Sequence, residues 1–198
     1  MNTGHIFYIM GKSASGKDTL YSLLLEKESL PLKRLVLYTT RPIRQGEKEG
    51  REYHFIDVDK LNEFRAAGRV VEERTYQTVE GPWTYCTIHD DKMDLTGDSY
   101  LAIGTLESYV QMKAYYGDEV MVPLYVEVSD DIRLERALNR ERKQETPRYQ
   151  EMCRRFLADC QDFSEENIAA AGISRRFSND GEMEECLGKL EECILGML

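Results

Sequence analysis

The residues with the clearest chemical signature lie near the start of the 198-residue chain. Residues 11–17 read GKSASGK and fit the spacing GxxxxGK. Glycines at these positions let backbone N–H groups curl around a phosphate, and the lysine reaches the β- and γ-phosphates of a nucleotide. An apolar stretch at residues 6–10 precedes the loop and a helical pattern follows it, which is the setting this motif requires. The sequence therefore predicts a P-loop.

The loop departs from the usual motif directly after its lysine. Asp18 stands where a serine or threonine normally binds Mg²⁺. Because a bare carboxylate beside a triphosphate would be repelled unless a cation lay between them, we expect Asp18 to hold Mg²⁺, directly or through water, with the hydroxyl of Thr19 beside it. The alternative is that Asp18 only complements the dipole of the following helix.

A second anion-binding pattern lies at residues 39–47, TTRPIRQGE. Arg41 and Arg44 are three positions apart on a loop constrained by proline and glycine. Guanidinium groups bind phosphate bidentately, so this arrangement suits one fixed anion better than a solvated run of charge, and the hydroxyl of Tyr53 can add a hydrogen bond. Two separate anion sites imply a donor nucleotide and a phosphorylated acceptor.

These segments resemble the signature of the guanylate kinase family, TTRxPRxGE followed by GxxYxF, and the resemblance spans most of the chain. The proline here follows Arg41 directly, one place early, while the spacing of the arginines is intact. The resemblance implies that Arg41, Arg44 and Tyr53 hold the phosphate of GMP. It also implies the reaction, in which ATP gives its γ-phosphoryl group to GMP or dGMP with Mg²⁺ as cofactor.

The resemblance extends to residues that would read the base. Glu72 looks like a family glutamate that accepts hydrogen bonds from the guanine edge, although without the resemblance it is equally a surface carboxylate. Tyr85 resembles a tyrosine that contacts phosphate, and Thr87 a hydroxyl residue that contacts the base. Gly104 stands about where the family has an aspartate that helps to read guanine and organise the metal, which leaves guanine selectivity in question.

An arginine-rich stretch over residues 133–155 carries a local charge of +4. It resembles the family's lid, whose arginines bridge the donor and acceptor phosphates and stabilise the charge on the transferred group. We expect Arg136, Arg140 and Arg155 to be catalytic; the alternative is that such arginines pair with glutamates one helical turn away. Asn179 resembles a family asparagine that touches adenine, or it is a turn residue before the final helix.

The elements that must position these residues predict an α/β fold. Strand patterns occupy residues 6–10, 34–40, 100–103 and 120–128, and helical patterns occupy residues 17–27, 60–67, 106–115, 129–142, 147–163 and 183–197. We expect one kinase domain over residues 1–198, with a P-loop parallel sheet and flanking helices, an inserted small mixed α+β subdomain that binds nucleoside monophosphate, and a helical lid. The expected boundaries are 1–40, 89–135 and 156–198 for the core, 41–88 for the insertion and 136–155 for the lid.

Composition excludes several other classes of protein. There are 26 Lys+Arg against 36 Asp+Glu, and the formal charge of −10 argues against binding to nucleic acid or an anionic membrane. Five widely spaced cysteines without a CxxC pair indicate neither a disulfide framework nor a zinc site. No signal-peptide pattern or membrane-length apolar stretch is visible, so we expect a cytoplasmic location. The sequence leaves the oligomeric state open.

The prediction is an ATP-dependent nucleoside monophosphate kinase whose partners are the small molecules ATP and GMP. Two alternatives stay open: a kinase acting on ribose 1,5-bisphosphate, and an inactive guanylate-kinase-like module that binds a protein, against which the intact P-loop argues. The residues predicted to bind ATP are Gly11, Ser13, Ala14, Ser15, Gly16, Lys17, Asp18, Thr19 and Asn179. Those predicted to bind GMP are Arg41, Arg44, Tyr53, Glu72, Tyr85 and Thr87. Those predicted to be catalytic are Lys17, Arg41, Arg44, Arg136, Arg140 and Arg155.

Overall fold

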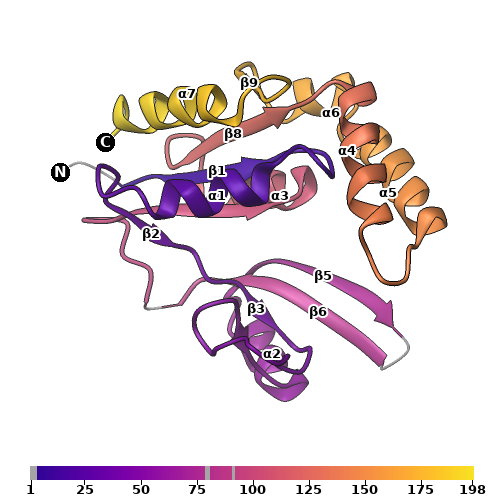
Figure 1. Ribbon diagram of the computed structural model, residues 1–198. Coiled ribbons are helices and arrows are strands. Elements are labelled where there is room, and N and C mark those ends of the chain that lie inside the picture. The colour runs from indigo at the N-terminus through magenta and orange to yellow at the C-terminus, as the bar shows by residue number, and fades with distance from the viewer. Residues whose placement is uncertain (1–3, 79–80, 91) are drawn as a thin grey trace.

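The computed structural model describes residues 4–78, 81–90 and 92–198 (Figure 1). Its central element is a five-stranded sheet of order β2-β7-β1-β8-β9, in which every neighbouring pair is parallel. The predicted α/β class with a parallel P-loop sheet is therefore confirmed. The strands of this core sheet are β1 (Ile6–Met10), β2 (Leu32–Arg34), β7 (Ser99–Gly104), β8 (Met121–Glu127) and β9 (Arg176–Ser178).

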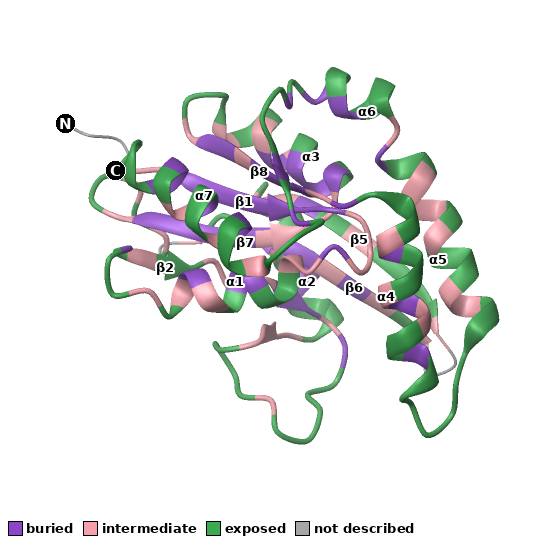
Figure 2. Cartoon of the chain, turned by 45° about the horizontal axis from the view of Figure 1, so that its top comes forward, coloured by how far each residue is buried: buried purple, intermediate pink, exposed green. Residues whose placement is uncertain are grey.

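Strand β1 is buried along its whole length because helices cover both faces of the core sheet (Figure 2). Phe7 and Ile9 pack against α1 and α7, whereas Ile6, Tyr8 and Met10 pack on the other face against α3 and α6. Each large apolar side chain buried in this way stabilises the fold by about 1.5–3 kcal/mol. The flanking helices are α1 (Lys17–Leu25), α3 (Leu106–Tyr116), α6 (Glu165–Ala170) and α7 (Met183–Leu195).

A second sheet, of order β4-β3-β6-β5, lies below the core in Figure 1. Its strands pair both parallel and antiparallel, and it packs against α2 around the side chains of Tyr38, Leu61, Cys86 and Ile88. The elements of this part are β3 (Tyr38–Thr39), β4 (His54–Phe55), α2 (Val58–Ala66), β5 (Val70–Thr78) and β6 (Gly81–Ile88).

The strand predicted over residues 34–40 is wrong, because the chain crosses between the two sheets there. β2 ends at Arg34 in the core sheet, and β3 begins at Tyr38 in the second sheet. The backbone N–H of Leu35 still donates to the carbonyl of Leu101, at 3.0 Å, on the core side of the crossing. An apolar stretch has the same pattern whichever sheet it pairs with, so the sequence did not reveal the break.

Two helices, α4 (Asp130–Arg142) and α5 (Tyr149–Asp162), form a pair at the end of the core sheet (Figure 1). α5 has no buried residue, whereas α4 buries Arg133, Ala137 and Glu141 along one face. Within residues 4–78, 81–90 and 92–198, no helix combines the length and apolar character that a bilayer crossing requires.

The start of α5 and the short helix after it differ from the sequence predictions. The helix predicted from residue 147 begins at Tyr149, and its N-cap is Arg148, whose backbone N–H donates to the carboxylate of Glu141. α6 was not predicted, because a helix of six residues is too short for apolar periodicity to show. Its N-cap is Ser164, whose hydroxyl accepts the N–H of Asn167 at 3.3 Å.

Candidate active site

The carboxyl ends of the core strands meet at one edge of the sheet, which is where ligands bind in open α/β folds. The P-loop follows β1, Thr105 follows β7, Ser129 follows β8 and Asn179 follows β9. The helices α4 and α5 stand beside this edge, and β5 and β6 lie below it (Figure 1). The predicted donor loop, lid and acceptor segment therefore surround one region.

Close backbone contacts shape the P-loop. A Cβ atom at Gly11 would lie 2.4 Å from the carbonyl oxygen of Val126, and one at Gly16, where φ is +85°, would lie 2.6 Å from Asn179 Nδ2. Asn179 is buried and donates from Nδ2 to the carbonyl of Ser15 at 2.8 Å. Asn179 thus supports the loop from the core side, while its predicted contact with adenine stays a prediction.

A buried ion pair, missed in the sequence, ties the P-loop to the lid helices. The Arg133 side chain is 1% exposed and donates to Asp159 Oδ2 at 3.2 Å, and the same oxygen accepts the N–H of Ser13 at 2.8 Å. Arg133 also pairs with Asp130 at 2.9 Å, and its guanidinium lies 3.9 Å from the ring centroid of Phe156. Through these contacts α4 and α5 both hold the loop.

Lys17 and Asp18 begin α1 and line a cavity of about 440 Å³. Lys17 Nζ lies 3.3 Å from Asp18 Oδ2, and the Asp18 side chain is 83% exposed. An exposed carboxylate and the exposed Thr19 hydroxyl fit Mg²⁺, which keeps several waters and takes few protein ligands. Among the residues that the structure describes, no group of three or more His, Cys, Asp or Glu could hold a metal, so substrate phosphates would supply the other ligands. Asp18 also lies in the first turn of α1, so its alternative role at the helix dipole stays open.

Arg41 is held in place at the acceptor end of the site. Its Nη1 and Nη2 donate to the carboxylate of Glu47 at 2.7 and 2.6 Å, and its guanidinium lies 5.1 Å from the ring centroid of Tyr53. The Arg41 guanidinium lowers the pKa of Glu47 to about 2, so this carboxylate is ionised. Arg41 Nε is buried and has no hydrogen-bond partner among the described residues. Glu47 lies in the TTRPIRQGE segment, but its role was not predicted from the sequence.

Arg44 differs from Arg41 because its guanidinium is exposed and makes no ion pair with a described acidic side chain. It lies 5.7 Å from the ring centroid of Trp83, and the backbone N–H of Arg44 donates to Glu47 at 2.8 Å. The rings of Tyr53 and Tyr85 are 5.5 Å apart, and both line the same cavity as Lys17. The structure therefore brings the predicted acceptor tyrosines and the P-loop lysine to one cavity.

Glu72 and Thr87, which are predicted to read the base, lie together but are closed off from solvent. The Glu72 side chain is 0% exposed; its Oε1 accepts from Thr87 Oγ1 at 2.9 Å and its Oε2 from Arg74 Nε at 3.2 Å. Arg74 lines the cavity that contains Lys17, but Glu72 and Thr87 do not. Arg74 belongs to no motif, so no pattern in the sequence indicated a role for it.

The three predicted lid arginines have different surroundings. Arg140 and Arg155 line a second cavity of about 540 Å³, to which Ser13 of the P-loop also contributes. Arg155 Nε donates to Glu151 at 2.9 Å, which is the one-turn pairing considered as the alternative. Arg136 and Arg140 make no ion pair with any described acidic side chain. These two arginines therefore have their full charge available for phosphate.

Comparison with known proteins agrees with this geometry. Residues 4–89 match the family model described as guanylate kinase. The guanylate kinase of Cupriavidus metallidurans is 39% identical over 69 residues, which cover 35% of this chain and 32% of that protein. The guanylate kinase of Aromatoleum aromaticum is 44% identical over 69 residues, covering 35% of this chain and 33% of that protein. The matched part spans about a third of the length of these curated relatives.

A solved structure extends the likeness along the rest of the chain. The crystal structure of guanylate kinase from Anaplasma phagocytophilum has a TM-score of 0.65, covers 99% of this chain and 87% of its own, and is 18% identical in sequence. At that identity the match establishes a shared fold. The chain therefore resembles guanylate kinases in sequence across residues 4–89, and it shares the fold of a guanylate kinase along nearly its whole length.

Proposed function

We propose that the protein is a guanylate kinase, which transfers the γ-phosphoryl group of ATP to GMP or dGMP and releases ADP and GDP. One observation supports this most directly: Lys17 of the P-loop lines the same cavity as Tyr53 and Tyr85, beside the fixed Arg41. With the donor phosphates at Lys17 and the acceptor phosphate at the tyrosines, the two phosphates would face each other, which transfer between them requires.

The donor side uses the P-loop, where Lys17 and backbone N–H groups of the loop would bind the β- and γ-phosphates. Mg²⁺ bound with ATP neutralises charge on these oxygens. Asp18 and Thr19 would hold the ion, since their exposed oxygens lie at the start of α1 next to Lys17.

On the acceptor side, Arg41 and Arg44 would bind the acceptor phosphate, together with Tyr53 and Tyr85, which line the cavity. An oxygen of this phosphate forms the new bond to the γ-phosphorus while the bond from that phosphorus to the β–γ bridging oxygen breaks, and ADP leaves. The attacking oxygen is already anionic near neutral pH, so positioning and charge neutralisation provide the rate rather than a strong base.

The lid would complete the site. Arg136, Arg140 and Arg155 would neutralise charge that develops on the transferred phosphoryl group. Closing the lid and the second sheet over both substrates would exclude water, which otherwise competes as acceptor. The domain boundaries given above, the small-molecule partners ATP and GMP and a cytoplasmic location belong to the same proposal.

The test is an ADP-release assay with ATP and Mg²⁺ and a panel of acceptors: GMP, dGMP, AMP, CMP, UMP and ribose 1,5-bisphosphate. We expect GMP and dGMP to be the preferred acceptors. Activity confined to ribose 1,5-bisphosphate would replace the proposal with the sugar-phosphate kinase. If no acceptor releases ADP above the slow rate with water, the inactive module is the better description.

A further inference from the structure

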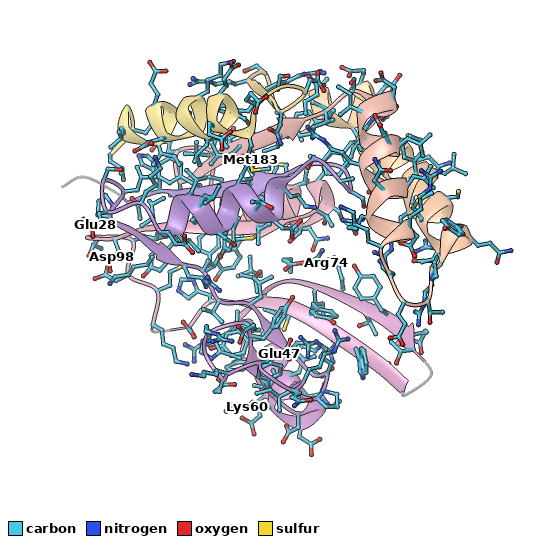
Figure 3. All side chains as sticks on the ribbon, in the orientation of Figure 1. Glu28, Glu47, Lys60, Arg74, Asp98 and Met183 are labelled. Carbon is cyan, nitrogen blue, oxygen red and sulfur yellow. The ribbon has the colours of Figure 1, made fainter. Side chains whose placement is uncertain are left out.

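Arg74 stands between the buried carboxylate of Glu72 and the acceptor cavity. In Figure 3, Arg74 is labelled in the space between the core and the second sheet. Its Nε donates to Glu72 Oε2 at 3.2 Å, and the other carboxylate oxygen is occupied by Thr87 at 2.9 Å. With both oxygens of Glu72 satisfied, Arg74 is the charged group at this end that a ligand meets first.

The guanidinium of Arg74 is held from both parts of the fold. Besides Glu72 in the second sheet, it contacts Thr105 in the core, with Nη1 to Oγ1 at 3.2 Å. Thr105 is itself fixed as the N-cap of α3, where its hydroxyl accepts the N–H of Ser108 at 3.2 Å. Nη2 has no hydrogen-bond partner among the described residues, so a fixed donor edge remains for a ligand.

Arg74 lines two cavities: the one that it shares with Lys17, and one of about 740 Å³ that also contains Glu107 and Asp162. The first of these holds little carboxylate charge that could compete with a ligand. A Cβ atom at Gly104 would lie 2.0 Å from the hydroxyl oxygen of Tyr8, so no aspartate fits there beside the present tyrosine. Burial raises the pKa of Tyr8, which keeps its hydroxyl neutral. Among the described residues that line the cavity shared with Lys17, Asp18 is the one carboxylate. In this cavity the charged group near the second sheet is therefore a donor, Arg74, beside hydroxyl groups that can donate or accept.

We propose that Arg74 determines the choice of base by donating to the O6 and N7 atoms of a 6-oxopurine. An arginine fork matches these two acceptors of guanine, whereas adenine places an amino donor where guanine has O6. This inference rests on the proposed function, since it concerns the acceptor of that reaction. It has a consequence that reading by Glu72 does not share: the 2-amino group is not recognised, so IMP should serve nearly as well as GMP.

The experiment compares kcat/KM for GMP, IMP and AMP in the wild-type protein and in Arg74→Met. For the wild type we expect GMP and IMP to agree within about threefold, and AMP to be at least about tenfold poorer. In Arg74→Met, the preference for GMP and IMP over AMP should fall by about tenfold or more, with KM for ATP unchanged. Arg65→Met is the matched control, because Arg65 pairs with Glu73 on the exposed side of β5 and lies outside the cavity.

Removing Arg74 leaves the buried Glu72 without its cation, so folding must be checked by circular dichroism and thermal melting. The double variant Arg74→Met/Glu72→Gln avoids the uncompensated charge and should show the same loss of selectivity. Arg74→Lys keeps the positive charge but lacks the paired N–H donors of the guanidinium, so this variant should also lose the selectivity.

Two results would overturn the role of Arg74 while leaving the proposed kinase intact. One is that the Arg74 variants lower kcat/KM by the same factor for GMP, IMP and AMP, as expected of a residue that only joins the two sheets. The other is a wild-type protein that uses GMP but rejects IMP by more than about a hundredfold, because a carboxylate that binds the 2-amino group rejects the analogue lacking it. Failure of the proposed function looks different, since the wild type would then phosphorylate no nucleotide.

Discussion

The donor loop and the acceptor arginines both bind phosphate in the proposed reaction, but the fold holds them in different ways. The P-loop is fixed by side chains from three other elements: Asn179 after β9, Asp159 on α5 and Arg133 on α4. Arg41 is held by nearby groups of its own part of the fold: its guanidinium donates to Glu47, six positions along the same loop, and to the carbonyl of Pro42 at 2.9 Å, and it lies beside the ring of Tyr53. The donor site is thus part of the core, whereas Arg41 depends on local contacts, of which Glu47 is the one carboxylate among the described residues.

The largest effect should come from removing the carboxylate that joins the P-loop to the lid. Asp159→Ala leaves the buried Arg133 with Asp130 alone and removes the acceptor of the Ser13 N–H. We expect a loss of about 3 kcal/mol in the free energy of unfolding, measured with urea. Gln161→Ala, an exposed change on the same helix, is the control. A loss below about 1 kcal/mol would show that the donor loop is not clamped in this way.

A smaller effect, confined to the acceptor, is expected from Glu47→Gln. Losing the bidentate partner frees Arg41, so kcat/KM for GMP should fall by about tenfold while KM for ATP stays the same. Glu52→Gln, beside Arg51 in the same segment, is the control. If the variant weakened the use of ATP as much as the use of GMP, the donor and acceptor sites would be coupled more tightly than their contacts indicate.

The effect of Glu47→Gln on stability should also depend on pH. The pKa of Glu47 is lowered in the folded protein from 4.5 to about 2, so its stabilising effect is complete above pH 4.5 and is lost as the pH falls towards 2. Thermal melting should be measured from pH 6 down to pH 2. The difference in melting temperature between the wild type and Glu47→Gln should become smaller as the pH falls. A difference in melting temperature that does not change with pH would contradict a stabilising ion pair between Arg41 and Glu47.

The smallest effect belongs to the outer face of the lid. Arg154 donates to Glu151 at 2.7 Å, but its side chain is 66% exposed. Exposed pairs of this kind contribute little, so Arg154→Met should leave both the melting temperature and kcat nearly unchanged. Arg140→Met is the contrasting variant, because Arg140 lines the second cavity and would neutralise charge on the transferred group; it should lower kcat by about a hundredfold.

The parts of the fold that were predictable from the sequence are those whose signals are local. β1 and α1 flank a motif with fixed spacing, and α7 repeats apolar residues at helical intervals. The break at residues 35–37 was not predictable, because it depends on which sheet each short strand pairs with. Site residues follow the same division: Lys17, Arg41 and Tyr53 lie within motifs, and they meet at the acceptor cavity or beside it.

Arg133 and Arg74 escaped prediction for a different reason, since their roles depend on distant partners. Arg133 is one of seven arginines in residues 133–155, and its burial requires Asp159, 26 positions away. Its spacing with Ala137 and Glu141 on one face of α4 was the available signal. Arg74 contacts Thr105, 31 positions away, and only the folded chain brings the two together.

The contact between Tyr8 and Gly104 also limits how this site can change by mutation. The ring of Tyr8 is buried and packs against Tyr109, so its hydroxyl cannot simply move aside for a new side chain. Gly104→Asp alone would therefore be damaging, whereas Tyr8→Val opens the space into which a carboxylate could be placed. The order of the two substitutions decides whether the intermediate folds, so an acidic base-reading group can be introduced here only by way of position 8.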